Sequence, residues 1–581
     1  MTPGPAPTGG RRQVFRTAND AYENPSLFSR PVAAYGLRLF TGETGQASAR
    51  MSQLDIETDV LVIGGGMAAT WAAISAAREG ACVVLADKGF VGSSGVTATA
   101  GPGHWWVPPD PKLREAAIEK RYPSAYGLAE RAWIERIIDT TWRVLPQLAP
   151  YYPFSLGGDG QTYYAGVRGP EYLRALRRYA AASGVRILDH HPALELLTHR
   201  DGSIAGAAGY ARLERRAWTA RAAGVVLATG GCAFRSGLIG SHTNTGDGYL
   251  MGVEAGAELS GMEFSAIYTL SPAWCSTRTL PYTAARFFDA EGQELDIPPP
   301  MSDRAHHRGL ASAMLAGPVY ADLSEAPEAL KPILRRIQPA TIAPFERRGV
   351  RLFEERFEVK LFGEGTIRGT GGLRITDHDC ETSARGLFAA GDAATRELIV
   401  GASSGGGSPN SAWALTSGLA AGAGAARLAR RQGRRAADRA FGVGQAGLRP
   451  TASPEAVDER AVIKTVQDEM LAYDKALWRR RASLEASLGR LDDAWAALAG
   501  HRRAEDLDQV AARETAALLA TARWSSRAAL ARNETRGLHA RADAPDLSPD
   551  GARRLLVGGL DKVWTRYETP VHQPQAAEAL A

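Results

Sequence analysis

Three consecutive glycines, Gly64 to Gly66, follow the apolar run DVLVI and precede a helix-like sequence that begins near Met67. A strand, a tight turn and a helix start in this order direct backbone N–H groups toward a pyrophosphate. Ala69 stands where the last glycine of this fingerprint would be, which is compatible because the position only has to let helix and strand pack closely. Taken alone, the motif also fits an ordinary glycine-rich turn.

An acidic residue follows at the distance that a nucleotide site requires. Asp87 ends a second apolar run, ACVVLAD, 23 residues after Gly64. A carboxylate at the end of the second strand would accept hydrogen bonds from a ribose, although an isolated acid there could also belong to a turn. The combination of strand, glycine turn, helix, strand and acid predicts nucleotide binding.

Other glycine-rich segments could bring backbone against the same ligand. The loop VGSSGVTATAGPG has small and hydroxyl side chains, AAGVVLATGG is an apolar strand running into two glycines, and GLFAAGDAA repeats that pattern with an acid. GASSGGGSPNSAWALTSG then leads into a helix whose N-terminus could face an anionic or carbonyl group. Residues 185–210 are predicted to form strands of a small sheet.

Composition narrows the function classes. The chain has 581 residues, 45% of them hydrophobic, and its 68 basic residues barely exceed its 63 acidic ones, so we do not expect nucleic-acid binding. The four cysteines contain no CxxC pair, which argues against an iron–sulfur, zinc or other metal site and against a disulfide framework. No apolar stretch of about 20 residues and no signal-peptide core are present, and a cytoplasmic protein without membrane insertion is predicted.

The motifs in this order resemble the flavoprotein subunits of the succinate dehydrogenase and fumarate reductase family, which includes L-aspartate oxidase and the adenylylsulfate reductase alpha subunit. The resemblance spans roughly residues 55–570. It rests on VIGGGMAA, ADKG, the small-residue loop, VVLATGG, TGDGYLMGVEAGAELSGMEF, GLFAAGDAA and RNETRGLHAR, the last being close to the family's R-x-E-S-R-G-x-H-x-R signature.

The resemblance implies that the nucleotide is FAD. Glycine and alanine in the first turn would hold its pyrophosphate, Asp87 its adenosine ribose, and Asp392 its ribityl or pyrophosphate region, while Ser408, Asn410 and Ser411 would lie near the isoalloxazine carbonyls. Respiratory members bind FAD through a histidine where Gly95 stands here, so noncovalent FAD is predicted. The full set of predicted cofactor-binding residues is Gly64, Gly66, Met67, Ala68, Ala69, Asp87, Lys88, Ser93, Ser94, Gly95, Ala228, Thr229, Gly230, Asp247, Gly391, Asp392, Ser408, Asn410 and Ser411.

The resemblance, together with a composition shift to prolines and aromatics after about residue 262, also implies the domain organisation. We expect an α/β fold: a Rossmann-like FAD-binding domain with an inserted α+β capping domain and a C-terminal helical domain. The expected segments are an N-terminal extension at 1–54, the FAD-binding domain at 55–261 and 366–432, the capping domain at 262–365, a linker at 433–455 and the helical domain at 456–581.

The catalytic residues are less clearly marked. In fumarate-reducing members an arginine of the inserted domain exchanges the proton, and RGLASAML matches its motif at Arg308, with Arg304 as an alternative. A guanidinium normally stays charged, so this role needs a coupled relay, yet the family's acidic neighbour is Gly309 here. A surface arginine at a helix start therefore remains the alternative. Tyr268 is a candidate orienting or acid group.

The family's dicarboxylate ligands are missing. Its F-x-Q-x-H-P-T motif is FSAIYTL here, with Tyr268 replacing a histidine, and its H-G-A-N-R is VGASS, which removes a histidine and a carboxylate-binding arginine. The GASS loop is closer to adenylylsulfate reductase, but Gly405 replaces that enzyme's histidine. Six aromatic residues either line the substrate site or pack in cores: Trp105, Trp106, Tyr163, Tyr164, Tyr268 and Trp274.

The resulting hypothesis is an FAD-dependent oxidoreductase that transfers hydride between flavin N5 and a small organic substrate other than succinate or fumarate. One alternative is an electron-transfer component of a complex resembling fumarate reductase, succinate dehydrogenase or adenylylsulfate reductase, with an iron–sulfur or other electron-transfer partner. Another is a flavin-binding scaffold without activity.

Overall fold

The computed structural model describes residues 53–277, 280–300, 304–337, 339–433, 439–449, 457–499 and 508–569. Nearly all of the predicted N-terminal extension lies outside these ranges, as do residues 434–438 and 450–455 of the predicted linker. Residues from Ser52 onward form one compact unit. None of the described helices is long and apolar enough to cross a membrane.

The largest sheet contains the predicted glycine motif at its centre. Its order is β16-β6-β7-β8-β1-β2-β5, with β15 pairing the end of β8, and the pairs β5-β2-β1-β8-β15 are parallel. The last four residues of β1 and all of β2 are buried, which explains their uninterrupted apolar sequence. The strands are β1 (Leu54–Ile63), β2 (Val83–Ala86), β5 (Arg186–Leu188), β6 (Ala193–Thr198), β7 (Ile204–Ala211), β8 (Arg216–Leu227), β15 (Leu387–Ala389) and β16 (Phe441–Gly442).

The strands predicted at residues 185–210 are present as β5, β6 and β7, but the prediction of a small sheet was wrong, because all three belong to this large sheet. Strand β8 is long enough to pair β7 along its first half and β15 along its second. An antiparallel β6–β7–β8 segment therefore continues directly from the parallel part.

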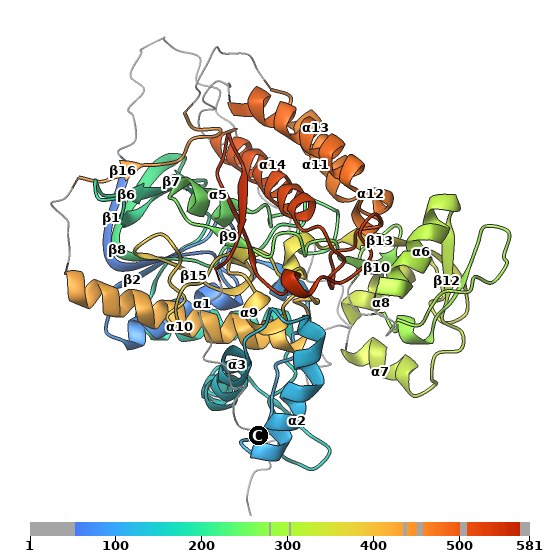
Figure 1. Cartoon of the computed structure of the whole chain (residues 1–581). Helices are drawn as coiled ribbons and strands as arrows, with labels where there is room; N and C mark the ends of the chain where they lie inside the picture. The colour runs from blue at the N-terminus through green and yellow to red at the C-terminus, as the bar shows by residue number, and fades with distance from the viewer. Residues whose placement is uncertain are drawn as a thin grey trace, which may run out of the picture. The chain divides into compact units, whose positions relative to one another are not determined.

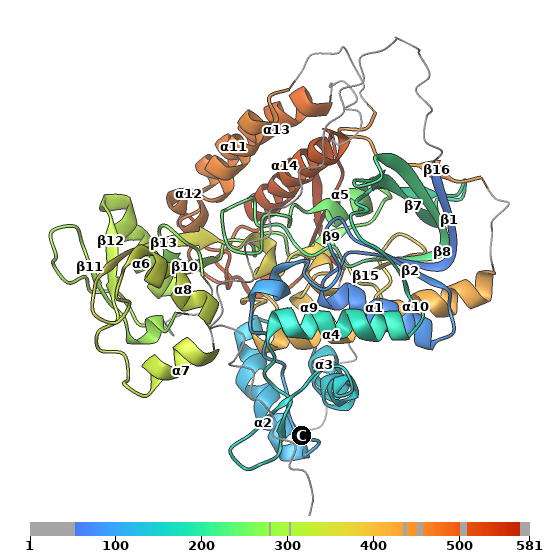
Figure 2. The ribbon, with the colours of Figure 1, turned by 180° about the vertical axis from the view of Figure 1, so that it is seen from behind.

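Two helices rich in small residues, α1 and α10, pack against this sheet (Figure 1). Helix α10 crosses α1 closely: a Cβ at Gly422 would lie 2.1 Å from the carbonyl oxygen of Ala72, so only glycine permits this approach. Figure 2 shows α4 and α3 near the same two helices from behind. The helices are α1 (Met67–Arg78), α3 (Arg131–Val144), α4 (Gly169–Ala182) and α10 (Ser408–Gln432).

A second sheet lies within the segment predicted to be the capping domain. It is antiparallel, in the order β10-β13-β12-β11, and has its own apolar core that includes Leu310 and Phe345. Helices α6, α7 and α8 are grouped with it (Figure 1). The elements are β10 (Tyr268–Pro272), β11 (Arg286–Phe288), β12 (Val319–Asp322), β13 (Phe357–Gly363), α6 (Arg304–Ala316), α7 (Leu330–Ile337) and α8 (Pro339–Arg348).

The C-terminal region is helical, as expected, but also contributes two strands. Along α13, Leu484, Leu488, Leu491 and Trp495 recur at a helical spacing and are buried, so they form the inner face of this helix. Strand β17 pairs with β9, which joins this region to the cofactor-binding half in the small sheet β14-β9-β17-β18. The elements are α11 (Glu459–Met470), α12 (Tyr473–Leu477), α13 (Arg481–Ala499), α14 (Asp508–Ala531), β9 (Leu259–Ser260), β14 (Gly372–Leu373), β17 (Leu555–Gly558) and β18 (Trp564–Tyr567).

Candidate cofactor and active site

A cavity lies beyond the carboxyl ends of β1 and β2, where open α/β sheets bind ligands. Segments far apart in the sequence line it, including the first glycine turn, the small-residue loop, the glycines after β8 and the GDAA segment. Fifteen predicted cofactor-binding residues line the cavity: Gly64, Gly66, Met67, Ala68, Asp87, Lys88, Ser94, Gly95, Ala228, Thr229, Gly230, Asp247, Gly391, Asp392 and Asn410.

The four remaining predicted residues do not line this cavity. Ala69 and Ser411 are buried inside α1 and α10, Ser93 is exposed, and Ser408 is half-buried at the start of α10. Ala69 nevertheless matches its predicted packing position. The roles of all these residues toward a cofactor stay predictions.

The glycine turn leaves space that side chains would fill. A Cβ at Gly64, whose φ is +124°, would lie 2.2 Å from the carbonyl oxygen of Ala228, and a Cβ at Gly65 would overlap the Asp87 carboxylate. No atom lies within 4 Å of the Cβ position of Gly66, at the N-cap of α1. Backbone is therefore open to the cavity at the helix N-terminus, as binding of a pyrophosphate requires.

Polar atoms in the cavity wall also fit a bound nucleotide. Asp87 accepts hydrogen bonds from the backbone N–H of Gly89, at 3.0 Å, and from the Ser94 hydroxyl, and burial raises its pKa. The hydroxyl of Thr229 and the amide oxygen of Asn244 are buried and have no hydrogen-bond partner among the described residues. Buried polar groups are nearly always paired, so these atoms suit a ligand such as FAD.

A charged cluster lies beside Asp87. Lys88 Nζ lies 2.7 Å from Asp247 Oδ2 and 2.8 Å from Glu514 Oε1, and Arg235 reaches the other oxygen of Glu514 at 2.6 Å. Burial alone would lower the pKa of Lys88, but the two carboxylates raise it overall. The sequence interpretation missed Glu514, which comes from α14, 426 residues after Lys88.

A second missed residue organises the opposite part of the wall. Arg396 is fully buried, and its Nη1 donates to Asp392 Oδ1 at 2.8 Å and to Asn410 Oδ1 at 2.9 Å. It also donates to the carbonyl oxygen of Ile367 at 2.8 Å. Arg396 follows the GDAA motif by two residues, and this closeness in sequence could have identified it as a site residue. Arg396 thus fixes two cavity-lining side chains.

The glycine-serine loop before α10 packs on two guanidinium groups. A Cβ at Gly405 would lie 3.0 Å from Arg396, and one at Gly406 would lie 2.4 Å from Arg368 Nε. Arg368 pairs with the buried Glu364 at 2.9 Å. His307 of α6 faces these charges; burial, followed by the charges of His306 and Arg368, lowers its pKa to about 4. His307 was not predicted as a site residue, because only the arginines of the sequence RAHHRGL, Arg304 and Arg308, matched the family motif.

The three predicted catalytic residues do not line the cavity. Arg308 Nε and Nη2 donate to the carbonyl oxygen of Leu477 at 3.1 and 2.7 Å, toward α12. Tyr268 is buried and its hydroxyl donates to the carbonyl oxygen of Leu471 at 3.2 Å. Arg304 begins α6, and its Nη1 has no hydrogen-bond partner among the described residues.

The six aromatic residues considered as substrate contacts are absent from this cavity wall. Trp106 packs between Trp142, at a centroid distance of 4.2 Å, and Tyr164, at 4.9 Å. Trp274 packs against Phe345 at 4.9 Å. The contacts of Trp106, Tyr164 and Trp274 are therefore packing contacts, whereas Tyr163 is 52% exposed at the surface.

Comparison of the chain with known proteins identifies its family. Residues 59–409, more than half of the chain, match the model described as FAD binding domain, and residues 467–571 match that described as Fumarate reductase flavoprotein C-term. The chain belongs to the succinate dehydrogenase and fumarate reductase family of flavoproteins. It is an FAD-dependent oxidoreductase of that family, and FAD is its cofactor.

Individual relatives are distant. A component of the fumarate reductase (CoM/CoB) of Methanothermobacter marburgensis is 26% identical, with 86% of this chain and 97% of the relative covered. L-aspartate oxidase of Mycobacterium leprae is 28% identical, with 86% and 95% covered. The structure of a FrdA variant of E. coli quinol fumarate reductase has a TM-score of 0.74 at 20% identity, with 90% of this chain and 99% of that chain covered, and supports the fold.

Proposed function

We propose that this oxidoreductase transfers hydride between flavin N5 and a C–H or C–N bond of a small organic substrate other than succinate, fumarate or aspartate. FAD supplies the hydride chemistry, while the protein positions the reactants and moves the proton. The cavity wall described above would bind FAD, with the first glycine turn at the pyrophosphate, Asp87 at the ribose, and Asp392 and Asn410 toward the flavin.

The state of the arginines near the flavin end supports this substrate class. A doubly charged dicarboxylate needs unneutralised, preorganised cations. Here Arg396 is paired with Asp392 and Arg368 with Glu364, so both charges are neutralised within the protein. The loop position occupied by arginine in the H-G-A-N-R motif is Ser404. These two neutralised guanidinium groups and the missing loop arginine favour a less charged substrate.

An anaerobic screen tests the substrate class. Purified protein with FAD would be mixed with candidate acids, amines, steroids and quinones, and bleaching or reoxidation of the flavin absorbance recorded. We expect turnover with an uncharged or singly charged compound and none with succinate, fumarate or aspartate. Turnover with one of these three at a rate comparable to the best compound would contradict the proposal.

The predicted proton-transfer residues can be tested with the substrate so identified. Arg308→Ala should abolish turnover and leave bound FAD unchanged if Arg308 moves the proton, with Tyr268 and Arg304 as the other candidates. Arg308→Lys keeps the charge but not the guanidinium geometry, and serves as the matched variant. Full activity in Arg308→Ala would assign the role to another residue.

The attachment of FAD follows from Gly95, which cannot form a covalent bond to the flavin. Acid precipitation should therefore release all yellow colour into the supernatant. Flavin retained in the pellet would show covalent attachment at another residue.

A second candidate function is that of an electron-transfer component of a larger complex. It is favoured by the similarity to the fumarate reductase (CoM/CoB) component over most of both chains. Co-purification of a cysteine-rich partner protein, with slow reoxidation of the isolated reduced chain by oxygen, would support it. Rapid reoxidation by oxygen would favour the first function.

A further inference from the structure

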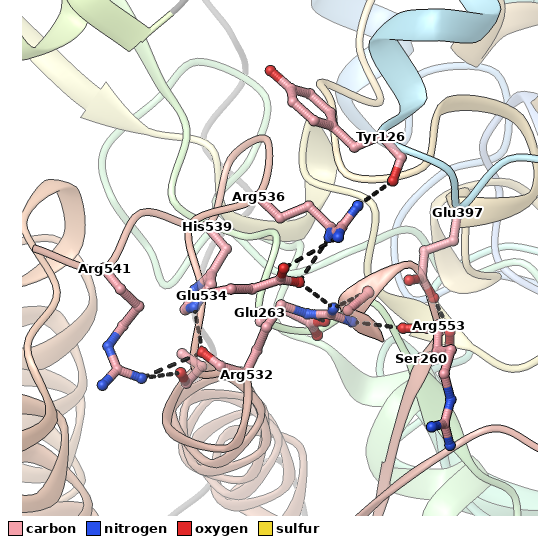
Figure 3. A network of polar contacts seen from close by, with 12 residues as sticks. Tyr126, Ser260, Glu263, Glu397, Arg532, Glu534, Arg536, His539, Arg541 and Arg553 are labelled. Carbon is pink, nitrogen blue, oxygen red and sulfur yellow. Dashed lines mark hydrogen bonds and ion pairs between the residues drawn. The ribbon is translucent and has the colours of Figure 1, made fainter. Parts of the chain in front are cut away.

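A buried network of charged side chains joins the C-terminal region to the cofactor-binding half (Figure 3). Its carboxylates are Glu263, Glu397 and Glu534, and all three are at most 2% exposed. The side chains converge from the loop after β9, from the start of α9 (Glu397–Val400) and from the segment after α14. The C-terminal members, Arg532, Glu534, Arg536, His539 and Arg541, belong to the RNETRGLHAR motif.

Two of the three carboxylates are paired with cations. Arg532 Nε lies 2.6 Å from Glu263 Oε1, and Arg536 donates to both oxygens of Glu534 at 2.7 and 3.1 Å. Glu397 makes no ion pair with any described residue within 4 Å, and its Oε2 accepts a hydrogen bond from the Ser260 hydroxyl. A fully buried carboxylate without a cation is strongly destabilised when ionised.

Four buried polar atoms in this part of the fold have no hydrogen-bond partner among the described residues. They are Glu263 Oε2, Glu397 Oε1, Ser265 Oγ and Thr370 Oγ1. The Glu397 carboxyl carbon and Thr370 Oγ1 both lie 3.0 Å from the Cβ position of Gly261, which places them together. Such atoms are normally satisfied by a proton or by ordered water. This group of atoms can therefore bind a proton and an ordered water molecule.

The cluster is directly connected to the cofactor cavity. Glu397 follows Arg396, the residue that holds Asp392 and Asn410 in the cavity wall. The backbone N–H of Arg396 donates to the carbonyl oxygen of Thr370 at 2.8 Å. A change of charge at Glu397 thus acts next to the group that fixes the flavin end of the wall.

We propose that Glu263 and Glu397 form a redox-linked proton site, in which Glu397 takes up one proton from solvent when the bound FAD gains two electrons. An O–H bond forms on the Glu397 carboxylate, no electron moves at either glutamate, and the proton is released again on reoxidation. The site compensates the negative charge that reduction adds near Arg396. Both glutamates are positioning residues that act through Arg396.

The charged groups that face Glu397 agree with this assignment. Burial and then the like charge of Glu263 raise the pKa of Glu397 to about 7, while Arg554, Ser260 and Arg532 act in the opposite direction. Arg554 is itself paired with Glu130 at 2.6 Å, so it only partly compensates Glu397. The occupancy of the site therefore changes in the neutral pH range.

The test uses the intact protein with FAD and needs no substrate, so its failure is distinguishable from failure of the substrate proposal. The FAD midpoint potential would be measured by dye equilibration from pH 5.5 to 8.5, and proton uptake during photoreduction with a pH indicator in weak buffer. Wild type should show a steeper dependence of potential on pH above about pH 7. Glu397→Gln should lose this steepening and take up about one proton fewer at pH 8.

Matched variants separate the proton site from general effects of mutation. Glu459→Gln removes a partly buried carboxyl group of α11 that does not face Arg396, and should behave as wild type. Ser260→Ala removes the hydroxyl that stabilises ionised Glu397, and should move the inflection to higher pH. If Glu397→Gln did not fold, two other measurements would test the proposal. They are the shift of the inflection in Ser260→Ala and a carboxylic-acid C=O band in the reduced-minus-oxidised infrared spectrum of the wild type. Unchanged potentials and proton uptake in Glu397→Gln, or no shift in Ser260→Ala and no such band, would overturn the proposal.

Discussion

The cofactor cavity and the glutamate–arginine network both contain buried polar atoms without partners among the described residues, but they are built in opposite ways. The cavity is shaped by backbone and by missing side chains, as at Gly64 and Gly66. The network is filled by the long side chains of its own residues, such as Arg532 and Glu263. The cavity therefore depends on shape, whereas the network depends on the balance of charge. Mutations that change one property at a time can test this difference.

The largest effect is expected from adding one methyl group to the cavity wall. Gly64→Ala places a Cβ 2.2 Å from the carbonyl oxygen of Ala228 at a φ of +124°, so strand and turn must separate. We expect loss of FAD binding, measured by flavin absorbance after gel filtration. Gly489→Ala on α13 is the control, because its Cβ also meets no protein atom within 4 Å and the residue does not line the cavity. FAD retention by Gly64→Ala would show that shape does not control this wall.

A smaller but still severe effect is expected when charge is removed from the network with volume largely kept. Arg532→Met leaves Glu263 buried without its ion-pair partner. Breaking a buried pair in this way costs about 3–5 kcal/mol of the free energy of unfolding. Thermal or urea unfolding would measure the loss. Arg527→Met, at a partly exposed pair with Asp492, should cost about 0–1 kcal/mol. Equal stabilities of the two variants would contradict the charge-balance argument.

The cavity and the network also differ in how far the sequence alone predicts them. The strand, glycine turn, helix, strand and Asp87 lie within about 35 residues and are set by local patterns, and the structure has them at those positions. The network joins residues more than 250 apart, such as Glu263 and Arg532. No local pattern specifies such contacts. Likewise Arg308 was selected from its motif, but its direction is set by the packing of α12 against α6.

Protonation offers a sharper test, because it changes charge in the network without changing shape. The pKa of Glu397 is about 7 in the folded chain against the usual 4.5, so the folded state binds more protons between these pH values. Wild-type stability should therefore fall as pH rises from about 4.5 to 7. Glu397→Gln should be more stable than wild type by up to about 3 kcal/mol above pH 7, and similar below pH 4.5. A pH-independent difference in urea unfolding would contradict this sign.

The smallest effect is expected at Lys88, which lines the cavity but is held by an ion pair. One partner is Glu514 of α14, so the C-terminal region acts on FAD through charge rather than shape. Glu514→Gln leaves the Asp247 partner at 2.7 Å. We expect FAD affinity to weaken about fivefold, or about 1 kcal/mol, as measured by calorimetric titration of the apoprotein. Because Arg235 also loses its carboxylate partner, Arg235→Met in the same titration separates the two contacts. An affinity loss in Arg235→Met as large as in Glu514→Gln would assign the effect to docking of α14, whereas a smaller loss would assign it to Lys88.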